Sequence, residues 1–163
     1  MRWPSLATLL PGLSLLVAML LMLVEWPPAL MPAKPYWLAL VLIFWLLESP
    51  DRLGLGSVFL LGLVADVFNG SLLGEQALRL VVLTFIVMRF RPRLRFFPMW
   101  QQTLAVLALL LNDRVLLLMV RAFAGDGMPP PAYWISPLAG ALLWPFVFLA
   151  LDGLRARLRM RVE

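Results

Sequence analysis

Long apolar stretches of this chain alternate with short segments rich in proline, glycine or arginine. A helix needs about 20 mostly apolar residues to cross about 30 Å of hydrocarbon, because each residue adds about 1.5 Å. The pattern therefore predicts an all-α polytopic integral membrane protein with a single membrane domain over residues 1–163. Its six predicted transmembrane helices lie at about residues 6–24, 33–49, 53–68, 72–88, 98–120 and 133–152.

The first two predicted helices each leave an alternative open. Residues 6–24 follow Arg2 and precede small residues, as a signal peptide would. Their apolar core is longer than the 7–15 residues usual for a signal peptide, which favours a retained helix. In the second helix, the apolar core 36–47 is short. It can span only if residues 32–49 contribute or the bilayer thins locally.

The polar segments predict how the helices are connected. Residues 25–35 and 122–131 are proline-rich and are interpreted as loops, because proline lacks the N–H that helix propagation uses. Residues 69–71, Asn-Gly-Ser, favour a turn. Residues 89–95 hold four arginines and a proline and are interpreted as a solvated connector rather than part of a span. Residues 154–163 form a basic, amphipathic cytoplasmic tail suited to anionic lipid headgroups.

Composition supports a bilayer as the solvent. Apolar residues make up 63% of the 163 positions and charged residues 14%, with a mean hydropathy of +0.91, so too few polar side chains exist to cover a water-facing surface. Cysteine and histidine are absent, which excludes disulfides, Cys/His zinc sites and imidazole catalysis. The net charge of +5 follows membrane topology, and we expect no nucleic-acid partner.

Arginine placement predicts the orientation of the chain. Ten arginines fall at the termini, in the 48–52 turn and in the 89–95 connector: Arg2, Arg52, Arg89, Arg91, Arg93, Arg95, Arg155, Arg157, Arg159 and Arg161. The opposite loops carry only Lys34 and, at a helix edge, Arg121. Short cytoplasmic loops are enriched in Lys and Arg, so both termini are predicted to be cytoplasmic. Six tryptophans lie near the proposed interfaces, as in aromatic belts: Trp3, Trp26, Trp37, Trp45, Trp100 and Trp134.

Five charged residues are expected to lie within the hydrocarbon: Asp66, Glu75, Arg79, Asp113 and Arg114. An ionised group near the bilayer centre costs about 2.5–3.5 kcal/mol on insertion scales, so each needs a partner or a purpose. Asp66 and Asp113 both lie about 20 Å from the inner ends of their helices, and Arg79 about 10 Å from the outer end of its own. All five are therefore expected in the outer half of the bilayer. Glu75 and Arg79 have the i,i+4 spacing of a helical ion pair.

Asp66 lies on a helix side that also carries Gly62 and Gly70. Small residues permit close approach between helices, so this side is expected to face protein, with the carboxylate reaching Arg79 or Arg114. Two interpretations stay open. One is a structural ion pair in the bundle interior, and the other is a polar pocket open to the outside.

The sequence gives little support for an enzymatic function. Asp66 and Asp113 share a depth, as the dyad of an intramembrane aspartic protease would, but nearby cations favour two ionised carboxylates rather than a shared proton. A serine nucleophile has no histidine, and the only lysine lies in an outer loop. No phosphate-binding glycine loop is present either. We expect no catalytic residue, cofactor or metal.

Taken in order, the motifs from about Trp26 to Arg155 resemble those of the MreD family of Gram-negative bacteria. They are Trp26-Pro27, Pro35-Tyr36-Trp37, Trp45, Pro50-Asp51-Arg52, Gly62-Leu63-Val64-Ala65-Asp66, Asn69-Gly70-Ser71-Leu72-Leu73-Gly74, Trp100-Gln101-Gln102, Tyr133-Trp134 and Leu143-Trp144-Pro145. The resemblance implies a non-enzymatic inner-membrane scaffold of the rod elongation machinery. Such proteins work with MreC, the actin-like MreB, the glycosyltransferase RodA and its transpeptidase partner in lateral peptidoglycan synthesis.

The family is also similar in architecture to the membrane substrate-binding components of energy-coupling-factor transporters. This similarity implies an alternative function, in which an outward-facing polar pocket captures a small solute. The scaffold would instead bind other proteins through its lipid-facing and loop surfaces.

Twelve residues are structural or partner-binding candidates. They are Asp66, Gly62, Gly70, Gly74, Arg79, Asp113, Arg114, Trp100, Gln101, Gln102, Trp144 and Pro145. Asp66 matches a family motif and is expected to organise helices 53–68, 72–88 and 98–120 for docking. Faces with Gly62 or the Ser136/Gly140 pair could admit a partner helix, or could serve packing within the chain. Arg79, Asp113-Arg114 and Glu48 do not match the shared motifs.

Overall fold

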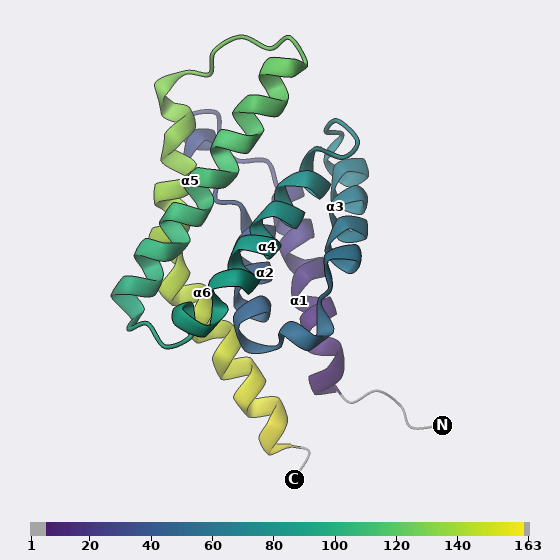
Figure 1. Ribbon diagram of the computed structural model, residues 1–163, viewed down its shortest axis with the longest axis vertical. Helices are drawn as coiled ribbons and strands as arrows, with labels where there is room; N and C mark the ends of the chain where they lie inside the picture. Colours follow the sequence, from purple (N-terminus) through teal and green to yellow (C-terminus); the bar gives the residue numbers. More distant parts are fainter. Residues whose placement is uncertain (1–5, 162–163) are drawn as a thin grey trace.

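The computed structural model describes residues 6–161, apart from the side chain of Ala7. Within these residues the chain forms six α-helices, three short 3-10 helices and no strand (Figure 1). The α-helices are α1 Leu6–Leu23, α2 Trp37–Glu48, α3 Leu55–Asn69, α4 Glu75–Leu94, α5 Met99–Phe123 and α6 Ile135–Met160. The 3-10 helices are η1 Met31–Ala33, η2 Pro50–Arg52 and η3 Pro131–Trp134.

Successive α-helices run in opposite directions along the bundle (Figure 1). The start of α1, the turns after α2 and α4 and the end of α6 lie at one end, called here the terminal end. The loops after α1, α3 and α5 lie at the other, called the distal end. An even number of antiparallel passes produces this arrangement, as the sequence predicted.

Helix α2 forms the centre of the bundle. Its residues from Leu38 to Leu47 are all buried, and it packs against α1, α4 and α6. A helix that is apolar all round has no polar face to present to water, so burial on every side suits it. Twelve residues extend only about 18 Å, but η1 and α2 together provide an 18-residue apolar segment, Met31–Glu48. This agrees with the expectation that flanking residues contribute to the second span.

Three segments of the described chain are long and apolar enough to cross a membrane: Met31–Glu48, Met99–Phe123 and Pro131–Met160. The apolar parts of α1 and α3, Thr8–Leu23 and Leu55–Asn69, are shorter. Large apolar side chains are exposed on the outside of the bundle, as on Val67, Phe85 and Leu142. Such a surface suits lipid contact, so the six helices fit a membrane bundle in which three meet the length and hydropathy criteria.

The predicted connector at 89–95 is wrong over most of its length, because α4 continues to Leu94 with Pro92 inside it. Proline removes one helical hydrogen bond, and tertiary contacts compensate. Arg91 Nε donates to the carbonyl oxygen of Leu47, 3.0 Å away, and so ties this turn of α4 to the end of α2. The predicted basic tail is also helical as far as Met160, as an extension of α6. Residues 162–163 lie outside the described residues.

Several arginines at the terminal end join helices rather than only facing lipid headgroups. Arg155 of α6 forms an ion pair with Glu48 at the end of α2. Arg52 Nη1 donates to the carbonyl oxygen of Thr8, 3.2 Å away. Glu48, which did not match the family motifs, thus has a structural role in this chain. Arg2 and Trp3 lie outside the described residues.

Placing Trp45 in an aromatic belt is wrong. Trp45 is only 2% exposed, and its Nε1 donates to Ser14 Oγ of α1 at 2.6 Å. An indole inside the bundle needs such a partner, because an unpaired N–H in an apolar environment is costly. The side chain therefore fastens α1 to α2.

Helices α3 and α4 make the most extensive contact in the bundle, and Gly62 permits it. A Cβ at Gly62 would lie 2.3 Å from Cα of Ala77 in α4. Gly140 of α6 is similar, since its Cβ would lie 2.7 Å from Cδ1 of Leu110. Both glycines therefore pack against other helices of this chain, which is the intramolecular alternative considered from the sequence.

We predict that Gly62→Ala destabilises the protein, because the added methyl group meets backbone atoms that cannot rotate away. Overpacking of this kind costs about 1–3 kcal/mol. The matched control is Gly56→Ala in the same helix, where a Cβ meets nothing within 4 Å. Thermal unfolding in detergent should show a lower midpoint for Gly62→Ala and an unchanged or higher one for Gly56→Ala. Equal midpoints would contradict the close approach of α3 and α4.

Candidate functional site

Asp66 organises the hairpin between α3 and α4 at the distal end. The side chain is 1% exposed and accepts three hydrogen bonds of 2.8 Å, from Ser71 Oγ and from the backbone N–H groups of Gly74 and Gln76. Gly74 is the N-cap of α4, so the carboxylate lies at a helix N-terminus, where exposed N–H groups favour a negative charge.

The glycines of this hairpin supply backbone conformations that other residues rarely adopt. Gly70 has φ +64° as it ends α3, and Gly74 has φ +95° as it begins α4. Left-handed glycines commonly end helices because they lack a Cβ. The stretch from Asp66 through Gly70 to Gly74 is therefore a local motif, in which glycines make the turn and the aspartate holds it closed.

The expectation that Asp66 reaches Arg79 or Arg114 is wrong. Asp66 is held by its own hairpin, and Arg79 instead binds Asp113 of α5, through Nε to Oδ1 at 2.9 Å and Nη2 to Oδ2 at 2.6 Å. Such two-point pairing is among the strongest contacts a guanidinium makes. Asp113 is 2% exposed. The pair therefore fixes α4 to α5 inside the bundle.

The Arg79 pair continues into a wider network. The guanidinium lies over the ring of Tyr36, 4.5 Å from its centroid, and Tyr36 Oη donates to Gln76 Oε1 at 3.1 Å. Glu75 Oε1 is 3.9 Å from Arg79 Nη1, which confirms the predicted i,i+4 pair, although it is long. The network thus connects α2, α4 and α5, and Gln76 joins it to Asp66.

Sequence reasoning missed some members of this network. Arg121 of α5 pairs with Glu75 at 3.3 Å and with Asp126 at 3.5 Å. Tyr36 and Gln76 also belong to the network and are not among the twelve sequence candidates. Tyr36 does carry a signal, since it belongs to the quoted Pro35-Tyr36-Trp37 motif. Gln76 directly follows Glu75, but no spacing rule relates it to a tyrosine forty residues earlier.

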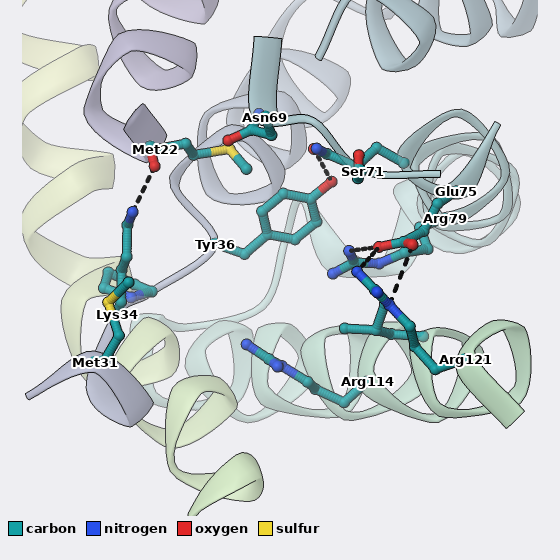
Figure 2. Close-up of a pocket in the computed structure, with 13 residues that line it drawn as sticks. Met22, Met31, Lys34, Tyr36, Asn69, Ser71, Glu75, Arg79, Arg114 and Arg121 are labelled. Atoms are coloured by element: carbon teal, nitrogen blue, oxygen red, sulfur yellow. Dashed lines mark hydrogen bonds and ion pairs between the residues drawn. The ribbon is translucent and has the colours of Figure 1, made fainter. Parts of the chain in front are cut away.

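A cavity of about 320 Å³ opens at the distal end beside this network (Figure 2). Its walls come from the end of α1, the segment from η1 to the start of α2, the α3–α4 hairpin, α4 and α5. They are lined by Met22, Met31, Lys34, Pro35, Tyr36, Asn69, Ser71, Glu75, Gln76, Arg79, Arg114, Leu117 and Arg121. The structure therefore contains both features that the sequence left as alternatives, a buried ion pair and a polar cavity.

Arg114 faces the cavity without a carboxylate partner among the described residues. Its guanidinium lies over the ring of Tyr133, 4.6 Å from the centroid, and Tyr133 Oη donates to the Arg114 carbonyl oxygen at 2.6 Å. Arg114 and Asp113 are neighbours in sequence but point to different partners.

The remaining candidates lie elsewhere. Gln102 Oε1 accepts from Trp144 Nε1 at 3.1 Å, and Gln102 Nε2 donates to the Leu94 carbonyl oxygen at 3.2 Å, which joins α4, α5 and α6. Trp100 is 64% exposed. Gln101 and Pro145 are partly buried. This group is separate from the cavity.

The arrangement does not form an aspartate dyad. Asp66 binds hairpin N–H groups and Asp113 binds a guanidinium, so each carboxylate has partners of its own. A shared proton would require the two acids to contact each other. Over residues 6–161, no three acidic side chains gather in a way that could hold a metal ion.

Comparison with known proteins gives one consistent result. The family model for the rod shape-determining protein MreD matches residues 4–153. The chain is also 33% identical over 144 residues to the rod shape-determining protein MreD of Haemophilus influenzae, covering 88% of this chain and 89% of that protein. No solved structure matches the chain. The similarity to energy-coupling-factor components therefore stays a prediction.

We predict that Arg79→Met destabilises the protein by about 3–5 kcal/mol, because it leaves the Asp113 carboxylate buried and uncompensated. The double variant Arg79→Met/Asp113→Leu should lose less than the sum of the two single variants. Asp126→Ala is the control, since its pair with Arg121 is about half exposed and such pairs contribute about 0–1 kcal/mol. Unfolding in mixed micelles measures all four variants. Additive losses would show that Arg79 and Asp113 do not interact.

Proposed function

Because the chain belongs to the MreD family of rod shape-determining proteins, we propose that it is a non-enzymatic scaffold of the cell-elongation complex in the bacterial inner membrane. In this role it binds MreC, RodA and the transpeptidase partner of RodA, with MreB also in the complex. It thereby helps direct lateral peptidoglycan synthesis and maintain rod shape. The family match along nearly the whole chain is the observation that carries this proposal.

The distribution of polar groups supports a scaffold. The strongest polar contacts, those of Asp66 and of Arg79 with Asp113, are made within the chain and brace four helices. Gly62 and Gly140 also pack against other helices of this chain, so they leave no groove for a partner helix. Partner helices would therefore dock on the exposed apolar faces of the bundle, where large side chains such as Phe85 and Leu142 are free.

Asp66 has an indirect part in this proposal. It closes the α3–α4 hairpin and, through Gln76 and Tyr36, sets the position of α2 beside α4. A partner that recognises the distal loops or the faces of α3 and α4 would need this arrangement. The side chain itself is buried and would not touch the partner.

Solute capture is the second candidate function, and the distal cavity of about 320 Å³ is the observation that favours it. A substrate-binding component would hold a small solute there and rely on a separate ATPase. Copurification from native membranes distinguishes the two functions. A tightly held solute with an ATPase favours transport, and a stable complex with MreC or RodA favours the scaffold.

We predict that Asp66→Ala lowers the recovery of MreC with the affinity-tagged chain, because the hairpin N–H groups lose their acceptor. Asp66→Glu should lower the recovery less, since it keeps a carboxylate. Asp152→Ala, at an exposed position of α6, is the control and should leave recovery unchanged. The measurement is the ratio of the two proteins after gentle solubilisation. Full recovery with both Asp66 variants would falsify the organising role of this residue.

The proposed orientation, with both termini cytoplasmic, has its own test. Alkaline phosphatase is active only outside the cytoplasm. We expect it to be inactive when fused after Glu163 and active when inserted near Gly127, in the loop between α5 and η3. The positive-inside distribution of arginines is the reason. The reverse pattern of activity would reject the orientation.

A further inference from the structure

We propose that the distal cavity binds a phosphate group, with Arg114 and Lys34 as its cationic ligands. The phosphate would come from the headgroup of a membrane lipid or from a soluble phosphate compound. The inference rests on the charges and walls of the cavity, and does not depend on the protein partners proposed above.

The cavity wall carries more cations than its acids neutralise. Of its four cations, Arg79 is held by Asp113, and Arg121 is held by Glu75 and Asp126. Glu75 is the one acidic residue on the wall as described. Lys34 and Arg114 form no ion pair among the described residues. Two positive charges outside any ion pair therefore face one cavity. Glu25 attracts Lys34 and Asp113 attracts Arg114, but neither acid is within ion-pair distance of them.

Lys34 and Arg114 lie apart from Glu75, the acidic residue of the wall. Figure 2 shows Glu75 and Arg121 on one side of the cavity and Lys34 on the other, with Arg114 extending from α5 toward the Lys34 side. Lys34 Nζ donates to the carbonyl oxygens of Met22 and Val24. An ammonium group has three N–H donors, so one is left for a ligand.

Contacts with Tyr133 position the Arg114 guanidinium so that an anion could bind it. The guanidinium lies against the Tyr133 ring, and the Tyr133 hydroxyl is fixed on the Arg114 carbonyl. Stacking on an aromatic ring leaves the edge N–H groups of a guanidinium available for an oxyanion. A partly buried charge without a counter-ion is unfavourable, and a bound anion would relieve that cost.

The other polar groups of the wall are already engaged. Ser71 donates to Asp66, Asn69 to the Ala65 carbonyl oxygen, and Tyr36 to Gln76. The free donors are therefore the two cations. Phosphate offers oxygens in several directions, so it can accept hydrogen bonds from more than one donor. Arginine and lysine are both established phosphate-binding side chains.

The apolar part of the wall suits a lipid source. Met22, Met31 and Leu117 line the same cavity. Both methionines belong to segments with exposed apolar neighbours, Leu21 and Leu30. A headgroup phosphate could enter beside Arg114 while its glycerol and acyl chains stay against this apolar side.

The test uses the full-length chain purified in a neutral detergent, with lipid binding measured by native mass spectrometry. Phosphatidylglycerol is the probe, and diacylglycerol, which lacks the phosphate, is the comparison. We expect Arg114→Gln to weaken phosphatidylglycerol binding roughly tenfold or more, since a charge-assisted hydrogen bond is lost. Arg114→Lys should restore part of the affinity. The matched control is Arg93→Gln, an exposed arginine of α4 at the terminal end, which should bind as the unmodified chain does.

Three results would overturn the proposal: diacylglycerol binding as tightly as phosphatidylglycerol, Arg114→Gln binding like the unmodified chain, or Arg93→Gln losing as much affinity as Arg114→Gln. If circular dichroism shows that Arg114→Gln does not fold, Lys34→Gln takes its place in the same comparison. Inorganic phosphate as competitor identifies the source. Displacement of the lipid at similar concentrations supports a soluble phosphate ligand, and no displacement supports a lipid headgroup.

Discussion

The Arg79 guanidinium lies inside the bundle, bound at two points by Asp113 and covered by the ring of Tyr36. A charge in such a place is tolerated only when a carboxylate and well-directed hydrogen bonds compensate for lost hydration. This requirement fixes how α2, α4 and α5 meet at the distal end. It also leaves Arg114, next to Asp113 in sequence, to face the cavity without an acid of its own.

In the Asp66 hairpin, buried polar groups also need partners, and they find them within the hairpin itself. Backbone N–H groups at the start of a helix need acceptors wherever burial keeps water from supplying them. Asp66 supplies them from within its own hairpin, and Gly70 and Gly74 provide the backbone turn. Gly62 then lets α3 and α4 approach closely. The hairpin and the Arg79 pair together join α3, α4 and α5 at the distal end, beside the cavity.

A bundle braced from within, with an apolar outer surface, is consistent with the membrane scaffold proposed above. Its buried polar contacts are used for internal bracing, and its exposed faces are apolar. The terminal end differs, because its arginines bind helix ends, as Arg91 and Arg155 do. The arginines that predict membrane orientation in the sequence therefore also join helices in the structure.

The sequence alone determined that this is an all-helical membrane protein. The lengths of the apolar segments, the proline-rich loops and the Asp66 to Gly74 motif are local features, so they can be recognised without knowing the tertiary structure. The sequence also placed the five charged residues in one half of the bundle, since helical rise fixes depth. Tertiary structure decided which charges pair: Asp113 took Arg79 because α5 lies against α4 there, and Asp66 was already bound within its hairpin. The continuation of α4 through Pro92 and the burial of Trp45 likewise depend on neighbouring helices, which local propensity does not encode.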